Sequence, residues 1–532
     1  IILFVLVVGL SLTLSSCKKE DKFGIDSDVE VEISMISWAG DGVYYGDIGH
    51  TNLSVEDLKN PKVAAVYANA KAFNELFPNV TINYYGKKDG PDDGGLFWED
   101  EIDNFKNTYG DYPNILPLTD TTGFLQKGYL ADLSRFEDDY YYKQYNPGLL
   151  EQTNFYGFQA ALPGYFIPAG IFINNQNIEQ ENLDEPSTDW TFSQFTQLIT
   201  SGQKGQGSDT YVSLSSMPDW WIQQEFLYNQ LFDGPQDGQY VSLNNDYTKT
   251  FFRDGVKRWS DYDFYGQADQ TFLEDNDSWG ARVFSNGKSL IHGSEPWFIT
   301  DFSTPTGWLP GPDGYDIYPF PSFEGSGNTI GTISDPTGIF NSCRDDGYAD
   351  CTEEEELKIK VAYTFQAFSS VDTAAWQARV NQQYTDSETS TVQTGVLDSS
   401  FPVTTGELYD EQMELWFSSP RHALYANESM VGFKAVNDII KSGNVKAISD
   451  KAYPWFYIDP DSGETRRIFE EFLTYYTIDE VGITDSGWYD AFAAKLPEWE
   501  TLFNERLEAA WEDIQEGLVT HYRYEENDSR FN

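Results

Sequence analysis

Two of the three cysteines are placed where they could form a covalent cross-link. Cys343 and Cys351 lie eight positions apart in the polar segment CRDDGYADC. In an exported protein this spacing predicts a local disulfide, and two free thiols are the alternative. Metal ligation is disfavoured, because the four histidines have no paired-ligand spacing such as HExxH, and we expect no bound metal. The four are His50, His292, His422 and His521.

Other motifs that could do chemistry depart from the patterns that they require. The glycine-rich stretch 325–331 lacks the lysine of a phosphate-binding loop and predicts a turn. Residues 459–463 (DPDSG) begin like a calcium loop but lack its terminal glutamate. The chain has no GxSxG motif, and among 86 Asp and Glu residues no pair can be singled out as a glycosidase pair. The residues alone therefore single out no catalytic site.

The chain is long and strongly acidic. Its 532 residues are 40% hydrophobic and 16% aromatic, enough to fill large cores and to form two or more domains. The 86 Asp and Glu residues outnumber 34 Lys and Arg, and the net charge of −52 would repel nucleic-acid phosphates and anionic lipid surfaces. Nucleic acid is therefore not expected as a partner. Acidity along the whole length indicates a solubility adaptation, for example to a saline habitat.

The first 17 residues are typical of an export signal. Residues 1–17 form an apolar run that is short for a membrane span, with small residues before Cys17. The end of this run, LSSC, resembles a bacterial lipobox, which implies that Cys17 becomes the acylated first residue of a lipoprotein. The run lacks Met and a basic start, so we expect a signal peptide truncated at its N-terminus. A buried helix or a simple membrane anchor is the alternative.

Residues 18–28 read as a polar tether, beginning KKEDK. We therefore expect an extracytoplasmic protein held to the cell membrane by lipid, at the cell surface or in the periplasm.

The segment after the tether alternates strands and helices. Residues 29–38 predict a strand that ends in Trp38. Apolar residues spaced three and four apart over 63–77 predict a helix that Pro78 ends. They are followed by predicted strands at 80–84 and 112–116 and predicted helices at 99–108 and 122–128. This alternation predicts an α/β lobe with a largely parallel sheet.

A series of short segments then runs along the chain in a recognisable order. They are FPNV at 77–80, YPNI at 112–115, GYLADL at 128–133, FYGFQAALP at 155–163, GIFINN at 170–175, PSTDWTFSQF at 186–195, FSNGKSL at 284–290, EPW at 295–297, YPFP at 318–321 and a helix over 356–370. Together they resemble the extracellular solute-binding proteins of sugar ABC transporters, the maltodextrin-binding type. No single motif is specific, but the shared order covers residues 29–415.

This resemblance implies a two-lobed periplasmic-binding-protein-like fold with the ligand in a cleft between the lobes. Lobe one would comprise residues 29–166 plus 318–340, and lobe two residues 168–316 plus 342–532. It also implies a monomer that is not an enzyme and needs no cofactor. Such a protein would bind a carbohydrate, in particular an oligosaccharide, and deliver it to the permease subunits of an ABC importer.

The tail over 415–532 departs from the family pattern because it is longer, helical and aromatic. Its tryptophans are Trp416, Trp455, Trp488, Trp499 and Trp511. We expect it to wrap lobe two or to contact a partner.

A sugar cleft needs exposed aromatic rings that stack on the C–H faces of pyranoses, beside polar side chains that bond the hydroxyls. The chain has 15 Trp, 34 Tyr and 37 Phe, most of which must lie in cores. We expect ligand contacts only at loop positions where the family's contacts fall. These candidates are Trp38, Asp120, Tyr165, Trp220, Trp221, Glu295, Trp297 and Asp335. Trp220 and Trp221 would divide the roles, with one ring in the cleft and the other packed.

Two other functions stay open from the sequence. A secreted carbohydrate-active enzyme, such as a glycosidase, would release reducing ends from oligosaccharides. A surface lipoprotein that captures glycans without a transporter would have no permease genes beside its own.

Overall fold

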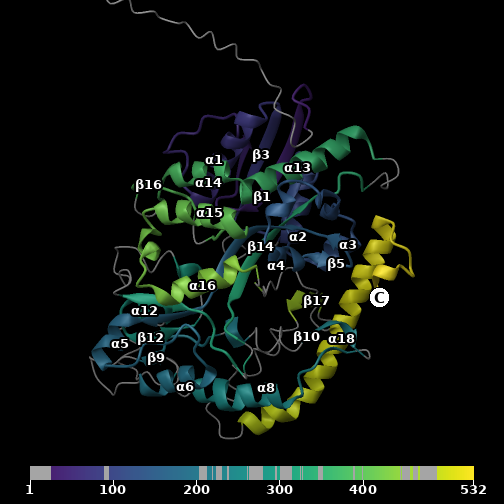
Figure 1. Ribbon diagram of the computed structural model, residues 1–532. Helices are drawn as coiled ribbons and strands as arrows, with labels where there is room; N and C mark the ends of the chain where they lie inside the picture. Colours follow the sequence, from purple (N-terminus) through teal and green to yellow (C-terminus); the bar gives the residue numbers. More distant parts are fainter. Residues whose placement is uncertain are drawn as a thin grey trace, which may run out of the picture.

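Two β-sheets joined by a pair of long strands organise the protein (Figure 1). Their strand orders are β2-β3-β1-β4-β14-β7 and β13-β8-β12-β9, and we call the parts built on them lobe one and lobe two. This computed structural model describes residues 25–88, 95–96, 98–202, 212–218, 220–222, 231–236, 239–260, 262, 280–293, 296–299, 314–323, 325, 327–344, 351–387, 390–397, 400–443, 445, 456–458, 465–467 and 488–531.

Lobe one is a mixed sheet with a parallel centre. Its strands are β1 (Val31–Trp38), β2 (Val43–Asp47), β3 (Val80–Lys87), β4 (Ile115–Pro117), β7 (Leu162–Ala169) and β14 (Gly331–Ile339), and its first helices are α1 (Pro61–Leu76), α2 (Trp98–Tyr109) and α3 (Thr121–Gln126). β1 pairs in parallel with both β3 and β4, which confirms the expected α/β lobe. β2 was not expected, and it adds an antiparallel edge to β3.

Local chemistry sets the bounds of α1. The Asn60 side chain accepts a hydrogen bond from the Lys62 amide, and Pro61 occupies the first helical position, where its missing N–H costs nothing. Val63, Ala70 and Phe73 are buried in the core of lobe one. Pro78 follows shortly after the end of the helix, so the predicted helix is confirmed.

The two long strands β7 and β14 carry the chain between the lobes. They pair antiparallel from Ala169 opposite Gly331 to Leu162 opposite Thr337, with a shift of register between Ser334 and Pro336. Gly170 then joins β7 to the first strand of lobe two. A Cβ at this position would lie 2.6 Å from the Tyr318 carbonyl oxygen, so the crossing needs a glycine here.

Lobe two consists of a smaller sheet covered by helices, and aromatic rings fill the core between them. Its elements are β8 (Ile171–Asn174), β9 (Val212–Leu214), β12 (Ser289–His292), β13 (Tyr315–Tyr318), α5 (Asn175–Glu181), α6 (Phe192–Ser201), α8 (Asp246–Phe251), the π-helix η5 (Phe252–Val256), α9 (Lys257–Ser260), α12 (Gly280–Ser285) and the 3-10 helix η6 (Pro296–Ile299). In its core the rings of Trp221 and Trp259 stack with centroids 5.1 Å apart, and Phe195 meets Trp221 edge-on. α6 begins with a capping box made by Thr191 and Gln194.

Short elements complete the described chain. They are α4 (Pro147–Glu151), the hairpins β5 (Asn154–Phe155) with β6 (Phe158–Gln159), β10 (Leu231–Gln236) with β11 (Gln239–Val241), β15 (Gln383–Thr385) with β16 (Val392–Thr394) and β17 (Phe456–Ile458) with β18 (Thr465–Arg467), and the 3-10 helices η2 (Leu133–Phe136), η3 (Tyr142–Gln144), η8 (Ala423–Ala426) and η9 (Ser529–Phe531).

The lobe boundaries expected from the sequence differ from the observed ones. β13 pairs with β8 and Phe320 lies in the core of lobe two, so lobe one resumes with β14 and not at residue 318. α13 (Glu353–Val371) contacts β1 and β7, and α14 (Thr373–Asn381) contacts α1, so both belong to lobe one. Their apolar faces, and not their position after the crossing, decide which core they join.

Two further helices close the junction of the lobes. α15 (Gly406–Ser418) packs on α14, and α16 (Val431–Lys441) packs on β13. Asp316 of β13 is buried and accepts hydrogen bonds from the amides of Gly432 (2.8 Å) and Phe433 (3.0 Å). Burial raises the pKa of this carboxyl to about 6, although these bonds and one from Ile317 oppose the shift. A carboxylate thus ties α16 to the sheet of lobe two.

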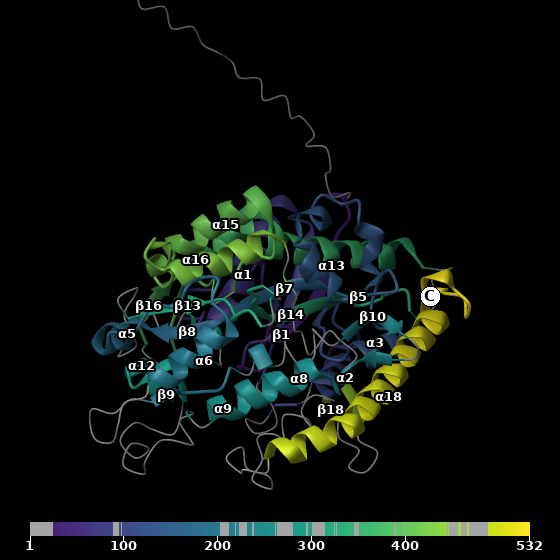
Figure 2. The same cartoon turned by 60° about the horizontal axis from the view of Figure 1, so that its bottom comes forward.

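The last long helix, α18 (Trp488–Tyr522), touches both lobes. It contacts β11 in its first half and α3 in its second half. Figures 1 and 2 both show its yellow ribbon starting near α8 and ending on the α3 side. The expectation that the tail belongs to lobe two alone is therefore wrong for α18, because its second half is buried in lobe one.

The predicted signal and tether, including Cys17, lie outside the described residues, except for residues 25–28. Within the described part of the chain, no helix combines the length and the apolar character needed to cross a membrane.

Cys343 and Cys351 are joined by a disulfide, with their Cα atoms 5.0 Å apart. The cross-link closes the loop directly before α13. Thr352, the next residue, caps that helix, and the side chain of Glu355 accepts from the Thr352 amide at 2.8 Å. The disulfide therefore holds the start of a helix that covers the sheet of lobe one.

We predict that replacing both cysteines by serine lowers the free energy of unfolding by about 2–3 kcal/mol, because the unfolded chain regains the entropy of a short loop. Urea unfolding of the wild type and the double variant measures the difference. Reductant should destabilise the wild type and leave the double variant unchanged. Equal losses in both proteins would contradict a contribution from this bond.

Candidate ligand cleft between the two lobes

The strand registers place the carboxyl ends of the central strands of lobe one toward lobe two. Met35 of β1 stands opposite Ile115 of β4, and Pro117 of β4 stands opposite Thr337 of β14. β14 enters from lobe two at Gly331, so β1, β3 and β4 all run toward that lobe. Loops at the carboxyl ends of parallel strands form the usual ligand site of open α/β sheets.

The sheet of lobe two faces back in the same way. β8 starts at the crossing, and β12 runs antiparallel to it, with His292 opposite Phe172. β9 is parallel to β12, with Leu214 opposite Ile291. The loops after β9 and β12 therefore lie at the crossing and face the loops after β1 and β4. These four loops define the candidate cleft.

Two exposed tryptophans stand on these loops, one on each lobe. Trp38 ends β1 and is 51% exposed, and Trp297 follows β12 in η6 and is 44% exposed. The other tryptophans whose burial is described are buried or half-buried. η6 contacts the crossing strand β7, so Trp297 stands beside the junction of the lobes. The Lys62 ammonium lies 4.3 Å from the centroid of the Trp38 ring.

A polar cluster that the sequence did not indicate lies at the end of β1 and the start of β2. The Tyr45 hydroxyl donates to Asp41 Oδ2 at 2.6 Å, and the hydroxyls of Ser37 and Tyr84 are 3.0 Å apart. Burial raises the pKa of both tyrosines, so they remain protonated donors at neutral pH. Asp41 follows the predicted strand by three residues and lies four residues before Tyr45, in the strand β2 that the sequence did not predict.

Asp120 lies at the carboxyl end of β4, as expected, and caps α3. Its Oδ1 accepts from the Gly123 amide at 2.9 Å. Burial raises the pKa of this carboxyl, and the bond from Gly123 and the charge of Lys127 oppose the shift. Its observed role is structural, and a ligand contact through it stays a prediction.

Tyr165 of β7 and Asp335 of β14 lie at the same level of the two crossing strands. Both fall where the pairing of β7 with β14 shifts register, and Asp335 is half-buried. A Cβ at the neighbouring Gly164 would lie 2.6 Å from Thr337 Oγ1, so the strands approach closely there. The structure does not describe the side chain of Tyr165.

Of the tryptophan pair after β9, Trp221 is packed in the core and is not placed to contact a ligand. It is 0% exposed and lies in the aromatic core of lobe two, where its ring stacks on Trp259. Trp220 is half-buried and packs against the edge of the same core. Glu295 lies outside the described residues.

A separate hollow of about 810 Å³ lies at the opposite, amino-terminal end of the strands of lobe one. Four of its polar residues are bonded in pairs: Asn83 donates to Glu32 at 2.5 Å, and the Ser34 amide donates to Asn114 at 2.8 Å. It is not continuous with the four loops of the cleft.

In the described part of the chain, one group of three potential metal ligands lies close together. It consists of Cys343, Cys351 and Glu356. Because the two cysteines are bonded to each other, this group does not present a metal site.

We predict that Trp221→Ala lowers the free energy of unfolding by about 3–5 kcal/mol, because it empties a filled core. Trp297→Ala should cost much less, since nearly half of that side chain already meets solvent. Denaturant unfolding of both variants without ligand makes the comparison. Similar losses would show that Trp297 belongs to a core and not to the cleft wall.

No protein-family model matches the chain, and no curated protein matches it. Solved structures share its fold. A sugar transporter from Rhizobium etli in an open conformation is 14% identical, with a TM-score of 0.53 over 91% of this chain and 99% of that one. UgpB from Mycobacterium tuberculosis with glycerophosphocholine is 14% identical, with a TM-score of 0.54 over 90% and 98%.

A third structure is an extracellular solute-binding protein of family 1 from Alicyclobacillus acidocaldarius. It is 11% identical, with a TM-score of 0.51 over 92% of this chain and 100% of that one. At identities this low, the structural similarity establishes the fold alone. The two-lobed architecture expected from the sequence is confirmed.

Proposed function

We propose that this chain, which has the two-lobed fold of extracellular solute-binding proteins, binds a carbohydrate in its cleft and delivers it to an ABC import permease. The observation that carries the proposal is the pair of exposed tryptophans, Trp38 and Trp297, on loops that face each other from the two lobes. Burying large rings is normally favourable, and their exposure at this place suits a ligand that covers them.

The chemistry of the cleft suits a sugar. Pyranose rings present C–H faces that stack on indole, and their hydroxyls need donors and acceptors. Tyr45 and Asp41 supply both kinds of group just after the end of β1. Asp335 adds a carboxylate at the crossing. The net charge of −52 disfavours anionic ligands and leaves neutral oligosaccharides as the class that fits best.

The proposal is of a binding protein and not of an enzyme. Hydrolysis of a glycoside needs two carboxyl groups that are free to act on one bond. In the cleft, Asp120 is engaged in capping α3 and Asp41 in a bond to Tyr45. Carboxylates held by these bonds are better suited to orienting a ligand than to transferring a proton to it.

The crossing strands suit a binding protein that closes on its ligand. A shift of register weakens the pairing of β7 with β14 locally, midway between the lobes. Two-lobed proteins close by changes of backbone angle in such crossing segments, and closure buries the ligand from both sides. We propose that the closed form, as a monomer, is what the permease recognises.

We further propose that the protein is exported and anchored by lipid on Cys17, with residues 18–28 as the tether. The apolar run before this cysteine and the polar tether after it support this placement. A fold of the solute-binding type would then stand at the membrane that holds its permease.

We predict that a screen of mono- and oligosaccharides by thermal shift finds a stabilising ligand, since a ligand at 100 times its Kd adds about 2.7 kcal/mol. With that sugar, Trp297→Ala and Trp38→Ala should each weaken binding about thirtyfold or more, the effect of losing a well-buried anchor worth about 2 kcal/mol. Calorimetric titration measures the affinities.

Tyr140→Ala is the matched control for these two variants. Tyr140 is another exposed ring of lobe one, packed against Tyr141 outside the four loops. Its loss should leave the affinity unchanged. Unchanged binding in both tryptophan variants would contradict the proposed cleft, and release of reducing ends would favour a glycosidase.

We predict that Cys17→Ser abolishes processing and labelling by radioactive fatty acid, while the lobes stay folded. The double variant of Cys343 and Cys351 is the control and should be labelled like the wild type. Labelling that persists in Cys17→Ser would rule out this anchor.

A further inference from the structure

The apolar stripe of α18 is divided between two cores. Its first part joins the core of lobe two through Phe492, Leu496, Trp499, Phe503 and Leu507. Its second part joins a core of lobe one through Ile514, Leu518 and Tyr522. Trp511, between the two parts, packs against both cores. One continuous helix is therefore a buried component of each lobe.

The first half of α18 is fastened to the backbone of lobe two. Glu500 Oε2 accepts from the amides of Leu243 and Asn244, each at 2.8 Å. Asn504 Oδ1 accepts from the amides of Tyr240 and Val241, at 2.6 and 3.1 Å, and its Nδ2 donates to the Val241 carbonyl at 2.9 Å.

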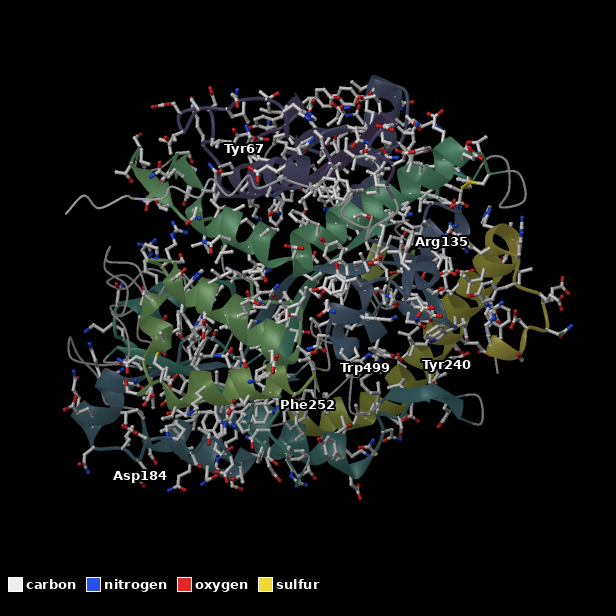
Figure 3. The ribbon with its side chains drawn as sticks, turned by 45° about the horizontal axis from the view of Figure 1, so that its top comes forward. Tyr67, Arg135, Asp184, Tyr240, Phe252 and Trp499 are labelled. Atoms are coloured by element: carbon white, nitrogen blue, oxygen red, sulfur yellow. A yellow bond between two sulfur atoms is a disulfide. The ribbon has the colours of Figure 1, made fainter. Side chains whose placement is uncertain are left out.

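Ring packing adds to these bonds. Phe492 stacks on Phe252 with centroids 4.6 Å apart. Figure 3 shows the labelled Tyr240, Phe252 and Trp499 along this part of the yellow ribbon. Backbone bonds and ring contacts together hold this half of the helix in one register.

The second half is fastened to lobe one. The Tyr522 hydroxyl accepts from the Leu130 amide at 3.2 Å, and His521 Nε2 lies 2.7 Å from the Gln126 carbonyl oxygen. A Cβ at Gly517 would lie 2.8 Å from the Leu125 carbonyl carbon, so the helix backbone approaches α3 closely. This contact leaves little room for α18 to shift on lobe one.

We propose that α18 is a brace that restrains the two lobes in the arrangement in which both cleft tryptophans are exposed. Pro497 removes one backbone hydrogen bond near the start of α18, but it precedes the side-chain hydrogen bonds that fasten both halves. The 23 residues from Glu500 to Tyr522 span about 34 Å and cannot stretch, because hydrogen bonds between successive turns fix the length of a helix. Any rotation of the lobes about β7 and β14 must therefore break or slide one of the two sets of contacts.

This restraint has a consequence for ligand binding, which rests on the proposed function. A ligand that closes the lobes must supply the free energy needed to release one end of the brace. Loosening α18 should therefore enlarge the closure that a ligand produces. The effect of the brace on the distance between the lobes of the free protein can, in contrast, be measured without any ligand.

The test is the distance between the lobes measured by pulsed electron paramagnetic resonance in the free protein. Spin labels are placed at Glu75→Cys on α1 and Gln180→Cys on α5, both exposed, in the full chain with Cys17→Ser. Glu500→Ala with Asn504→Ala releases the lobe-two end, and His521→Ala with Tyr522→Phe releases the lobe-one end. If either pair does not fold, Asn504→Ala or Tyr522→Phe alone replaces it.

The matched control is Glu498→Ala with Glu505→Ala, two exposed positions on the same helix. We expect a narrow distance distribution in the wild type and the control, and a broader or shifted one in either release variant. Distributions identical to the wild type in both folded release variants overturn the brace. Failure to find any sugar ligand would contradict the proposed function but leave this measurement unaffected.

Discussion

The antiparallel pairing of β7 with β14 is the interaction on which the rest of the structure depends. It holds the edge of the sheet of lobe one, and both strands lead into the strands of lobe two. Its direction decides which ends of β1 and β4 face the other lobe, and therefore where the cleft lies. The close approach at Gly170 allows a single residue to separate the end of β7 from the start of β8. With another topology, the same loops would not converge.

Burial then sorts the aromatic residues into two groups. Trp190, Trp221, Trp259, Trp376 and Trp416 are fully buried and fill the cores. Trp38 and Trp297 keep about half of their surface exposed on opposing loops, at a cost in apolar exposure. A ligand can change the exposure of the second group only. Covering an exposed ring is favourable, whereas a core ring has no further surface to bury.

The C-terminal part of the chain strengthens the junction of the lobes in a second way. α13 and α14 cover lobe one, α16 is tied to lobe two by Asp316, and α18 enters both cores. The crossing strands allow relative rotation, whereas a rigid helix fixed at both ends opposes it. The balance of these two connections, and not the sheet alone, sets how easily the lobes move.

The amino-acid sequence by itself determined the local elements and the order of the fold. Apolar spacing and Pro78 define α1, and the strand that ends in Trp38 and the helix α13 were both predictable, because their signals lie within a few residues. It also placed Trp38 at the end of the first strand, where the structure has it. The tertiary structure alone decided that Trp221 is core and that α18 joins both lobes. Each of these depends on which distant surfaces pack together, and a helix with an apolar stripe carries no information on which core will bury it.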